Sequence, residues 1–420
     1  MPIFAAPYPL PTAHPAPSRR FSNGILRAAR GVKNISSSTD RKPLCYDDYP
    51  PNRTALVVDR ESPFRKPRIA EIPVPAPKSG EILIEVHAAG VNTIDWFNTN
   101  LLATVPPFLR QSPFVPGKDV SGVVVAVGPG VTEWHQGDEV FGTTGKKLTT
   151  GLDGMKPEEL ASGSFAAFVI LNVKCCARKP WNVSFIDAAG IPLAGLTAWQ
   201  ALVETAQLKE GSKVLILGGA GGVGTLAVQI ANIHCKCDAV AVTCSKSSSA
   251  LVKALGADLV IDYHTQFFEQ AVGAERYDCV VDAVGYDDKC RRVSSILRRS
   301  GILVDVTGPP SLSHLRKGQK TDSMFKHFQG VSGDGKRVRY TKIDAKPDGK
   351  VLRKLASYME KGQLIPVTDK VYDGLGSVQE AFDFSKSGRA HGKLIIDLKE
   401  KREEKPSSEP TQGAEYSWTS

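Results

Sequence analysis

The stretch Lys213–Gly224 reads KVLILGGAGGVG, and it decides the fold of the chain. Val214–Leu217 is a short, continuous apolar run, typical of a strand buried on both faces of a parallel sheet. Gly219, Gly221 and Gly224 follow in a G-x-G-x-x-G pattern, and the next residues, TLAVQIA, are compatible with a helix. A strand, a glycine turn and a helix in this order predict a dinucleotide site, because the glycines let a pyrophosphate approach the helix N-terminus. A glycine-rich turn in another type of α/β protein is the alternative.

The length and composition predict a globular protein of two domains with extensions. The chain has 420 residues, too many for one typical core, and its 41% hydrophobic and 23% charged residues are an ordinary composition. No apolar run approaches the roughly 20 residues that a membrane-spanning helix needs. Eight cysteines without an evenly spaced framework indicate a reducing compartment rather than a disulfide scaffold.

The net charge of +9 does not indicate a nucleic-acid-binding protein, because more than half of it lies in one N-terminal segment. Residues 1–39 contain five basic side chains and no acid, which leaves +4 for the remainder. An arginine- and serine-rich, acid-free and weakly amphipathic segment is typical of a mitochondrial presequence. We therefore expect residues 1–50 to be a presequence and linker, and the protein to be located in the mitochondrial matrix. A disordered tail without a targeting role is the alternative.

Two local patterns divide the rest of the chain. From Thr54 to about residue 181, short strands such as Glu81–His87 are separated by Gly and Pro, which predicts a compact, barrel-like β domain. From about Asn182, strands alternate with helices, which predicts a parallel sheet with helices on both faces. A final strand is expected over Gly392–Asp397, and residues 399–420 have the polar composition of a disordered tail.

Seven motifs carry a resemblance to a known family. The chain from about residue 52 to 398 resembles the medium-chain dehydrogenase/reductase superfamily, in its zinc-free quinone-oxidoreductase branch, and is most similar there to the mitochondrial reticulon-interacting NADPH oxidoreductases. The motifs follow the family order: HAAGVNTIDW at 87–96, PGKDVSGVVVAVGPGV at 116–131, GDEVFG at 137–142, IPLAGLTAW at 191–199, GGAGGVG at 218–224, LGADLVIDY at 255–263 and GKLIIDL at 392–398.

This resemblance implies an α/β fold in two domains. A GroES-like β-barrel domain, residues 51–181 and 341–398, is split around a Rossmann domain with a doubly wound parallel sheet, residues 182–340. The cofactor is expected in the cleft between the two domains. Relatives form homodimers through an exposed edge strand of the Rossmann sheet, and residues 331–340 are the candidate for that strand here.

The residues after the second Rossmann strand favour NADPH over NADH. An NAD-selective fold places an acid about 20 residues after the glycine motif, but Ser245 and Lys246 stand at this point, the former 21 residues after Gly224. A hydroxyl and an ammonium suit the 2′-phosphate of NADPH through charge-assisted hydrogen bonds. The resemblance places Tyr263 near the same phosphate. The alternative is a solvated loop that happens to carry a lysine.

Two further groups of residues are expected at the cofactor. The resemblance places Thr197 near the nicotinamide carboxamide, and it aligns the C-terminal segment with one that returns to the cofactor. In that segment Gly392 allows close approach and Lys393 has the charge to reach a phosphate, although a turn entering the last strand is equally compatible. The full set of candidate cofactor residues is Thr197, Gly219, Ala220, Gly221, Gly222, Val223, Gly224, Ser245, Lys246, Tyr263, His391, Gly392 and Lys393.

The sequence predicts no metal site. Zinc-dependent relatives carry a cysteine ligand after the AAGVN-like strand, a histidine in a G-H-E motif and a four-cysteine lobe. Here Gly90–Thr93 and Gly117–Asp119 lack the thiolate and the imidazole, and the chain has no C-x2-C-x2-C cluster. The nearest His/Cys group, His234–Cys237, lies between a helix and a strand, where a structural role is favoured.

Without a metal, hydride transfer from NADPH needs an acceptor activated by conjugation, such as a quinone or an enone. The protein must then stabilise the developing enolate or phenolate by hydrogen bonds. Asn92 is a candidate donor to the substrate or a support for the nicotinamide, and Asp95 is a candidate proton relay or simply a helix cap. Lys118 is a candidate positive charge for an oxyanion, with a salt-bridged surface lysine as the alternative.

Three functions stay open at this point. The first is an NADPH-dependent, zinc-free oxidoreductase of quinones or activated alkenes, and the second is an enoyl-thioester reductase. The second is weakened because mitochondrial enoyl reductases of this superfamily use a tyrosine of the β domain, and no tyrosine stands between Tyr49 and Tyr263. The third is an NADPH-binding scaffold or sensor with little turnover, since no decisive catalytic acid or base is visible.

Overall fold

The computed structural model describes residues 50–63, 66–104, 106, 108, 113–145, 162–274, 276–285, 289–307 and 339–399. The expected presequence, most of the candidate dimer edge and the C-terminal tail lie outside these residues. Within the described part of the chain, no helix has the length and apolar character needed to cross a membrane.

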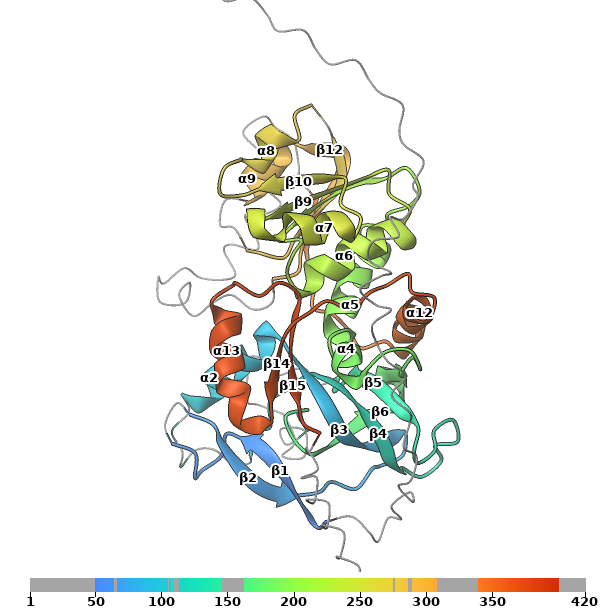
Figure 1. Cartoon of the computed structure of the whole chain (residues 1–420), viewed down its shortest axis with the longest axis vertical. Coiled ribbons are helices and arrows are strands. Elements are labelled where there is room, and N and C mark those ends of the chain that lie inside the picture. Colours follow the sequence, from blue (N-terminus) through green and yellow to red (C-terminus); the bar gives the residue numbers. More distant parts are fainter. Residues whose placement is uncertain are drawn as a thin grey trace, which may run out of the picture. The chain divides into compact units, whose positions relative to one another are not determined.

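The first sheet contains strands from both ends of the described chain. Its order is β14-β15-β3-β4-β5-β7, with β6 paired to β3, and Figure 1 shows β14 and β15 beside β3. β15 runs antiparallel to β3, so that Leu394 lies opposite Val91. This sheet is the GroES-like part, and its chain is interrupted by the second sheet, as expected. The strands are β3 (Glu81–Val91), β4 (Asp119–Val127), β5 (Glu139–Thr143), β6 (Phe168–Asn172), β7 (Cys176–Arg178), β14 (Thr368–Asp373) and β15 (Lys393–Asp397).

The stretch Gly163–Ile170 (GSFAAFVI) has the pattern of one strand, but β6 begins only at Phe168, because the residues before it pair with a different strand. β1 (Asn52–Val57) forms a separate antiparallel pair with β2 (Arg68–Pro73). The backbone N–H of Leu56 donates to the Phe165 carbonyl at 2.9 Å, which ties this pair to the segment before β6. The first part of this stretch therefore pairs with β1 and the second part, β6, pairs with β3, although its apolar pattern is continuous.

The second sheet is the Rossmann sheet. Its order is β10-β9-β8-β11-β12-β13, and every neighbouring pair is parallel. The apolar run of β8 is fully buried in its centre, as the sequence predicts. The strand order reverses beside β8, and ligands of open α/β sheets bind at such a switch point. The strands are β8 (Lys213–Leu217), β9 (Ala239–Cys244), β10 (Leu259–Asp262), β11 (Tyr277–Asp282), β12 (Leu297–Asp305) and β13 (Arg339–Lys342).

Helices cover this sheet and connect it to the first one. The helix after the glycine turn, α6, is buried along most of its length, because its small and apolar residues pack on β8 and β9. The α-helices are α2 (Thr93–Ala103), α4 (Phe185–Ala189), α5 (Pro192–Trp199), α6 (Gly222–Ile233), α7 (Ser249–Ala254), α8 (Phe268–Ala271), α9 (Lys289–Ser294), α12 (Gly349–Glu360) and α13 (Val378–Lys386). Shorter helical turns are η4 (Val173–Cys175), η5 (Gln200–Thr205), η6 (Lys246–Ser248) and η7 (Leu375–Ser377).

The third glycine of the motif allows α6 to pack against the end of β8. A Cβ atom at Gly224 would lie 2.2 Å from the carbonyl oxygen of Gly218 and 2.6 Å from the Cα of Gly219. Both are backbone atoms, so they can give way only if the turn itself is deformed. The glycine is required here by close approach and not by an unusual backbone angle.

We therefore expect Gly224→Ala to lower the free energy of unfolding by about 1–3 kcal/mol, the usual range for overpacking. Gly376→Ala is the matched control, because a Cβ atom there would meet no heavy atom within 4 Å. Urea denaturation of both variants measures the difference. Equal midpoints for the two variants would contradict this account of the turn.

Candidate functional site

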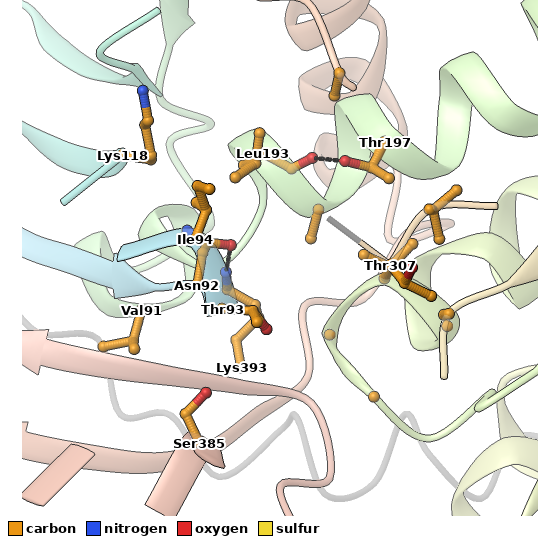
Figure 2. Close-up of a pocket in the computed structure, with 18 of the residues that line it drawn as sticks. Val91, Asn92, Thr93, Ile94, Lys118, Leu193, Thr197, Thr307, Ser385 and Lys393 are labelled. Atoms are coloured by element: carbon orange, nitrogen blue, oxygen red, sulfur yellow. Dashed lines mark hydrogen bonds between the residues drawn. The ribbon is translucent and has the colours of Figure 1, made fainter. Parts of the chain in front are cut away.

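A pocket of about 650 Å³ is lined by residues of both sheets and of the segments that join them (Figure 2). One side comes from the glycine turn and from the ends of β11 and β12. The other side comes from the end of β3, the start of α2, one face of α5 and the start of β15. Of the candidate site residues, it brings together Asn92, Lys118, Thr197, Gly221, Gly222, Val223, Gly224, Gly392 and Lys393.

The glycine turn exposes its backbone to this pocket. A Cβ atom at Gly219 would lie 1.8 Å from Cγ1 of Val242, so this residue holds the turn flush against β9. At Gly221 the nearest atom would be 3.6 Å away, so its surface is open. α6 begins at Gly222, and the first N–H groups of a helix have no partner within the helix. An open backbone at a helix N-terminus suits the pyrophosphate of a dinucleotide, so these residues fit that group.

The C-terminal segment meets the glycine turn directly. Gly221 and Gly392 form an isolated parallel bridge. Gly392 has a φ of 109°, and a Cβ atom there would lie 2.3 Å from the Val367 carbonyl oxygen, so only glycine fits. A Cβ atom at Gly222 would lie 2.9 Å from Cδ of Lys393. The aliphatic part of this lysine therefore passes beside the start of α6.

The head of Lys393 lies in a buried polar cluster rather than in the open part of the pocket. Its Nζ donates to Asn92 Oδ1 at 2.7 Å (Figure 2) and to Asp119 Oδ2 at 3.2 Å. Asn92 Nδ2 donates to the same carboxylate oxygen at 2.9 Å. The donor group that we expected to face the substrate is thus directed at Asp119, and the ammonium expected at a phosphate is paired with a buried acid.

Asp119 is the residue that sequence reasoning missed. It opens β4, its side chain is fully buried, and its other oxygen accepts a 2.8 Å hydrogen bond from the backbone N–H of Leu193 at the start of α5. Burial raises the pKa of Asp119, and the Lys393 ammonium acts in the opposite direction. The sequence feature that could have identified Asp119 is an acid at the start of a strand that is otherwise uncharged, DVSGVVVAV.

Asp95 is buried beside this cluster and does not line the pocket. One carboxylate oxygen accepts a 2.8 Å hydrogen bond from the backbone N–H of Asn92, which is the helix-capping contact. The pKa of Asp95 is raised to about 7, mainly by burial and also by the nearby Asp119, while the hydrogen bond from Asn92 N and the charges of Lys393 and Lys118 oppose the shift. The capping role is visible in the structure, and the role in proton transfer stays a prediction.

The two other candidates on the pocket wall lie away from the cluster. Lys118 lines a separate part of the wall, and Figure 2 shows its ammonium directed away from Asn92. Its carbonyl accepts a hydrogen bond from Thr144 N at 2.8 Å, which fixes its backbone. Thr197 lines the pocket from α5, and its hydroxyl donates to the Leu193 carbonyl at 2.7 Å.

The candidate phosphate residues gather at a different edge, outside the pocket lining. Ser245 directly follows Cys244, and Tyr263 directly follows Asp262, which is the partner of Cys244 in the β9–β10 pairing. Lys246 is exposed, and Tyr263 is also largely exposed beside His264. Ser245 and Tyr263 thus follow the paired ends of adjacent parallel strands, with Lys246 next in the chain, and their role at a phosphate stays a prediction. Gly219, Ala220 and His391 do not line the pocket either.

Among the described residues, no group of three or more His, Cys, Asp or Glu side chains is arranged to hold a metal ion. Asn92 and Lys118 present an amide and an ammonium on the pocket wall. An ammonium does not bind a metal ion. The absence of zinc stays a prediction for the whole chain.

Because its pKa is raised above the unfolded value, Asp95 contributes stability that is fully present below the unfolded pKa, near 4. That contribution is lost as the pH rises through about 7. We expect wild-type protein to lose stability relative to Asp95→Asn as the pH is raised from about 4 to 8, in urea denaturation at several pH values. Asp383→Asn is the control, since a hydrogen bond from Lys386 lowers the pKa of Asp383, so its contribution is lost only as the pH falls below about 4 and should change little between pH 4 and 8. A pH-independent difference between wild type and Asp95→Asn would contradict the prediction.

Two protein families match the chain. The family described as alcohol dehydrogenase GroES-like domain matches residues 78–181, which contain β3 to β7. The family described as zinc-binding dehydrogenase matches residues 255–396, which contain the second half of the Rossmann sheet and the return to the first sheet. The first match lies within the first sheet, and the second spans strands of both sheets.

Three relatives illustrate the similarity. The chloroplastic NADPH-dependent alkenal/one oxidoreductase of Arabidopsis thaliana is 35% identical over 78% of this chain and 74% of its own. The mitochondrial NAD(P)H oxidoreductase RTN4IP1 of Danio rerio is 30% identical over 77% of this chain and 85% of its own. The solved structure of the quinone oxidoreductase from Coxiella burnetii has a TM-score of 0.66 and 28% identity, and covers 83% of this chain and 100% of that one. The chain therefore belongs to the medium-chain dehydrogenase/reductase superfamily and is an NAD(P)H-dependent oxidoreductase.

Proposed function

We propose that the protein is a zinc-independent, NADPH-dependent oxidoreductase that transfers a hydride to a quinone or an activated alkene. The observation that carries this proposal is the shared pocket. It joins the open backbone of the glycine turn on one side to the buried Asn92–Asp119–Lys393 cluster on the other. The relatives named as alkenal/one and quinone oxidoreductases support the same acceptor classes.

The residues that would hold the cofactor fall into three groups. The backbone of Gly221–Gly224 would receive the pyrophosphate at the N-terminus of α6. Thr197 would contact the nicotinamide end, and Ser245, Lys246 and Tyr263 would bind the 2′-phosphate. When bound, NADPH supplies the hydride from C4 of its nicotinamide ring.

The rest of the pocket has the chemistry that a conjugated acceptor needs. Val91, Ile94 and Leu193 give the lining an apolar surface for a flat ring or chain. Two lysines, Lys118 and Lys393, are among the described lining residues, and because Lys393 is paired with Asp119, Lys118 is the cation that we propose for the acceptor side. Positive charge in a partly buried site stabilises the oxyanion that forms when a quinone or an enone accepts a hydride.

The alternatives are disfavoured to different degrees. Among the described residues that line the pocket there is no tyrosine, so enoyl-thioester reduction by a tyrosine proton donor lacks its residue. A scaffold that binds NADPH with little turnover differs from the enzyme only in rate, and it is an outcome of the acceptor test below.

We further propose a mitochondrial matrix location through residues 1–50, supported by the name of the Danio rerio relative. The homodimer, the candidate edge at 331–340 and the exact domain boundaries stay predictions. A homodimer through the Rossmann edge would extend the sheet beyond β13, which is its terminal strand in the described chain.

For the cofactor, we expect wild-type protein to bind NADPH more tightly than NADH, and Lys246→Ala to lose about 10- to 100-fold of that preference. A hydrogen bond to a charged group is worth about 1.5–3 kcal/mol, which corresponds to this range. Lys253→Ala is the matched control, because Lys253 is also exposed but lies along α7. Fluorescence titration with both nucleotides measures the preference. An unchanged preference in Lys246→Ala would remove this residue from the 2′-phosphate site.

For the acceptor, we expect NADPH oxidation with a panel of quinones and enones, and little with enoyl thioesters. Lys118→Met should lower kcat/KM about tenfold or more, since it removes a charge that faces a developing oxyanion. Lys350→Met, an exposed lysine at the start of α12, is the control. NADPH binding without turnover on any acceptor would contradict the enzyme and support the scaffold.

A further inference from the structure

We infer that Asp119 is a positioning residue of the cofactor site: it holds the side chains of Lys393 and Asn92 on the pocket wall without lining the pocket itself. This inference rests on the proposed function, which assigns the pocket to NADPH and its acceptor. The inference adds Asp119, which belongs neither to the glycine motif nor to the residues that line the pocket, to the residues of the proposed cofactor site.

The hydrogen bonds of Asp119 all lead to the pocket wall. Its carboxylate accepts from Asn92 Nδ2 at 2.9 Å, Lys393 Nζ at 3.2 Å and Leu193 N at 2.8 Å. These donors come from the end of β3, the start of β15 and the start of α5, and all three of these residues line the pocket. Asp119 is fully buried and absent from the lining. One hidden carboxylate thus joins three segments that form the wall.

Lys393 carries this constraint to the glycine turn. Its stem passes the position where a Cβ atom of Gly222 would lie, 2.9 Å away, and its neighbour Gly392 forms a bridge with Gly221. Its head is held by Asp119 and Asn92. A lysine held at both ends has few rotamers left, so the ammonium occupies a defined place between the turn and β3.

The charge of Asp119 matters as well as its hydrogen bonds. Lys393 is 5% exposed, and a buried ammonium without an anion is strongly unfavourable. If Asp119 became neutral, the ammonium would keep Asn92 Oδ1 as its acceptor in the cluster and would be driven to move its head. The charge of Asp119, which Asp119→Asn removes while the amide oxygen can still accept from Leu193 N, is therefore expected to act on the pocket through Lys393.

A double-mutant cycle tests this. We expect Asp119→Asn and Lys393→Met each to weaken NADPH binding about tenfold or more, measured by titration at a temperature where all variants are folded. The double variant should bind no worse than Lys393→Met alone, because the acid acts through the lysine. It should also regain thermal stability relative to Lys393→Met, which leaves Asp119 buried without its cation.

Asp187→Asn is the matched control. This acid also joins two segments by accepting from Thr368 Oγ1 at 3.1 Å, but it does not line the pocket, and its other side-chain hydrogen bond comes from Ser184. If Asp119→Asn does not fold, Asp119→Ser takes its place in the cycle, because it is smaller and keeps an acceptor. If the two substitutions weaken NADPH binding by factors that multiply in the double variant, this inference is wrong but the proposed function stands. The same holds if an Asp119 variant binds NADPH as tightly as wild type. Wild-type protein that binds no NADPH would overturn the proposed function and this inference with it.

Discussion

The close approach of backbone to backbone at the glycine turn is the constraint on which the rest of the site depends. Gly224 lets α6 start against the end of β8, and Gly219 lets the turn lie flat against β9. Gly221 then remains with an open surface and pairs with Gly392 from the other sheet. The pocket lies beside this turn because Gly219 and Gly224 let the turn pack closely on β9 and α6, while Gly221 leaves its surface open.

The segment of the first sheet that meets this turn comes from the C-terminal part of the described chain. β15 adds to β3, and its first residue, Lys393, reaches the buried acid at the start of β4. The glycine turn, the end of β3 and the start of α5 are thereby fixed to one another by a few hydrogen bonds and one ion pair. The proposed hydride transfer requires such a fixed relation between cofactor and acceptor, because small displacements are costly for reaction rates.

The sequence predicted the fold well because the signals that determine it are local. The apolar run before Gly219 and the alternation of strands and helices after Asn182 are properties of short windows, and the structure confirms both. The late start of β6 and the cluster around Asp119 depend on residues that are distant in the chain. Asp119 and Lys393 are 274 positions apart, and no local pattern relates an acid at the start of one strand to a lysine at the start of another.

The most direct test of the central claim is the NADPH dissociation constant of Gly221→Val. The backbone at Gly221 has a φ of −77°, which any residue adopts, and a Cβ atom there meets no atom closer than 3.6 Å. The substitution should therefore leave the thermal stability of the free protein almost unchanged. It should weaken NADPH binding by about 100-fold or more, because the side chain fills the space assigned to the pyrophosphate. Wild-type affinity in a stable Gly221→Val variant would show that the cofactor does not bind at this turn.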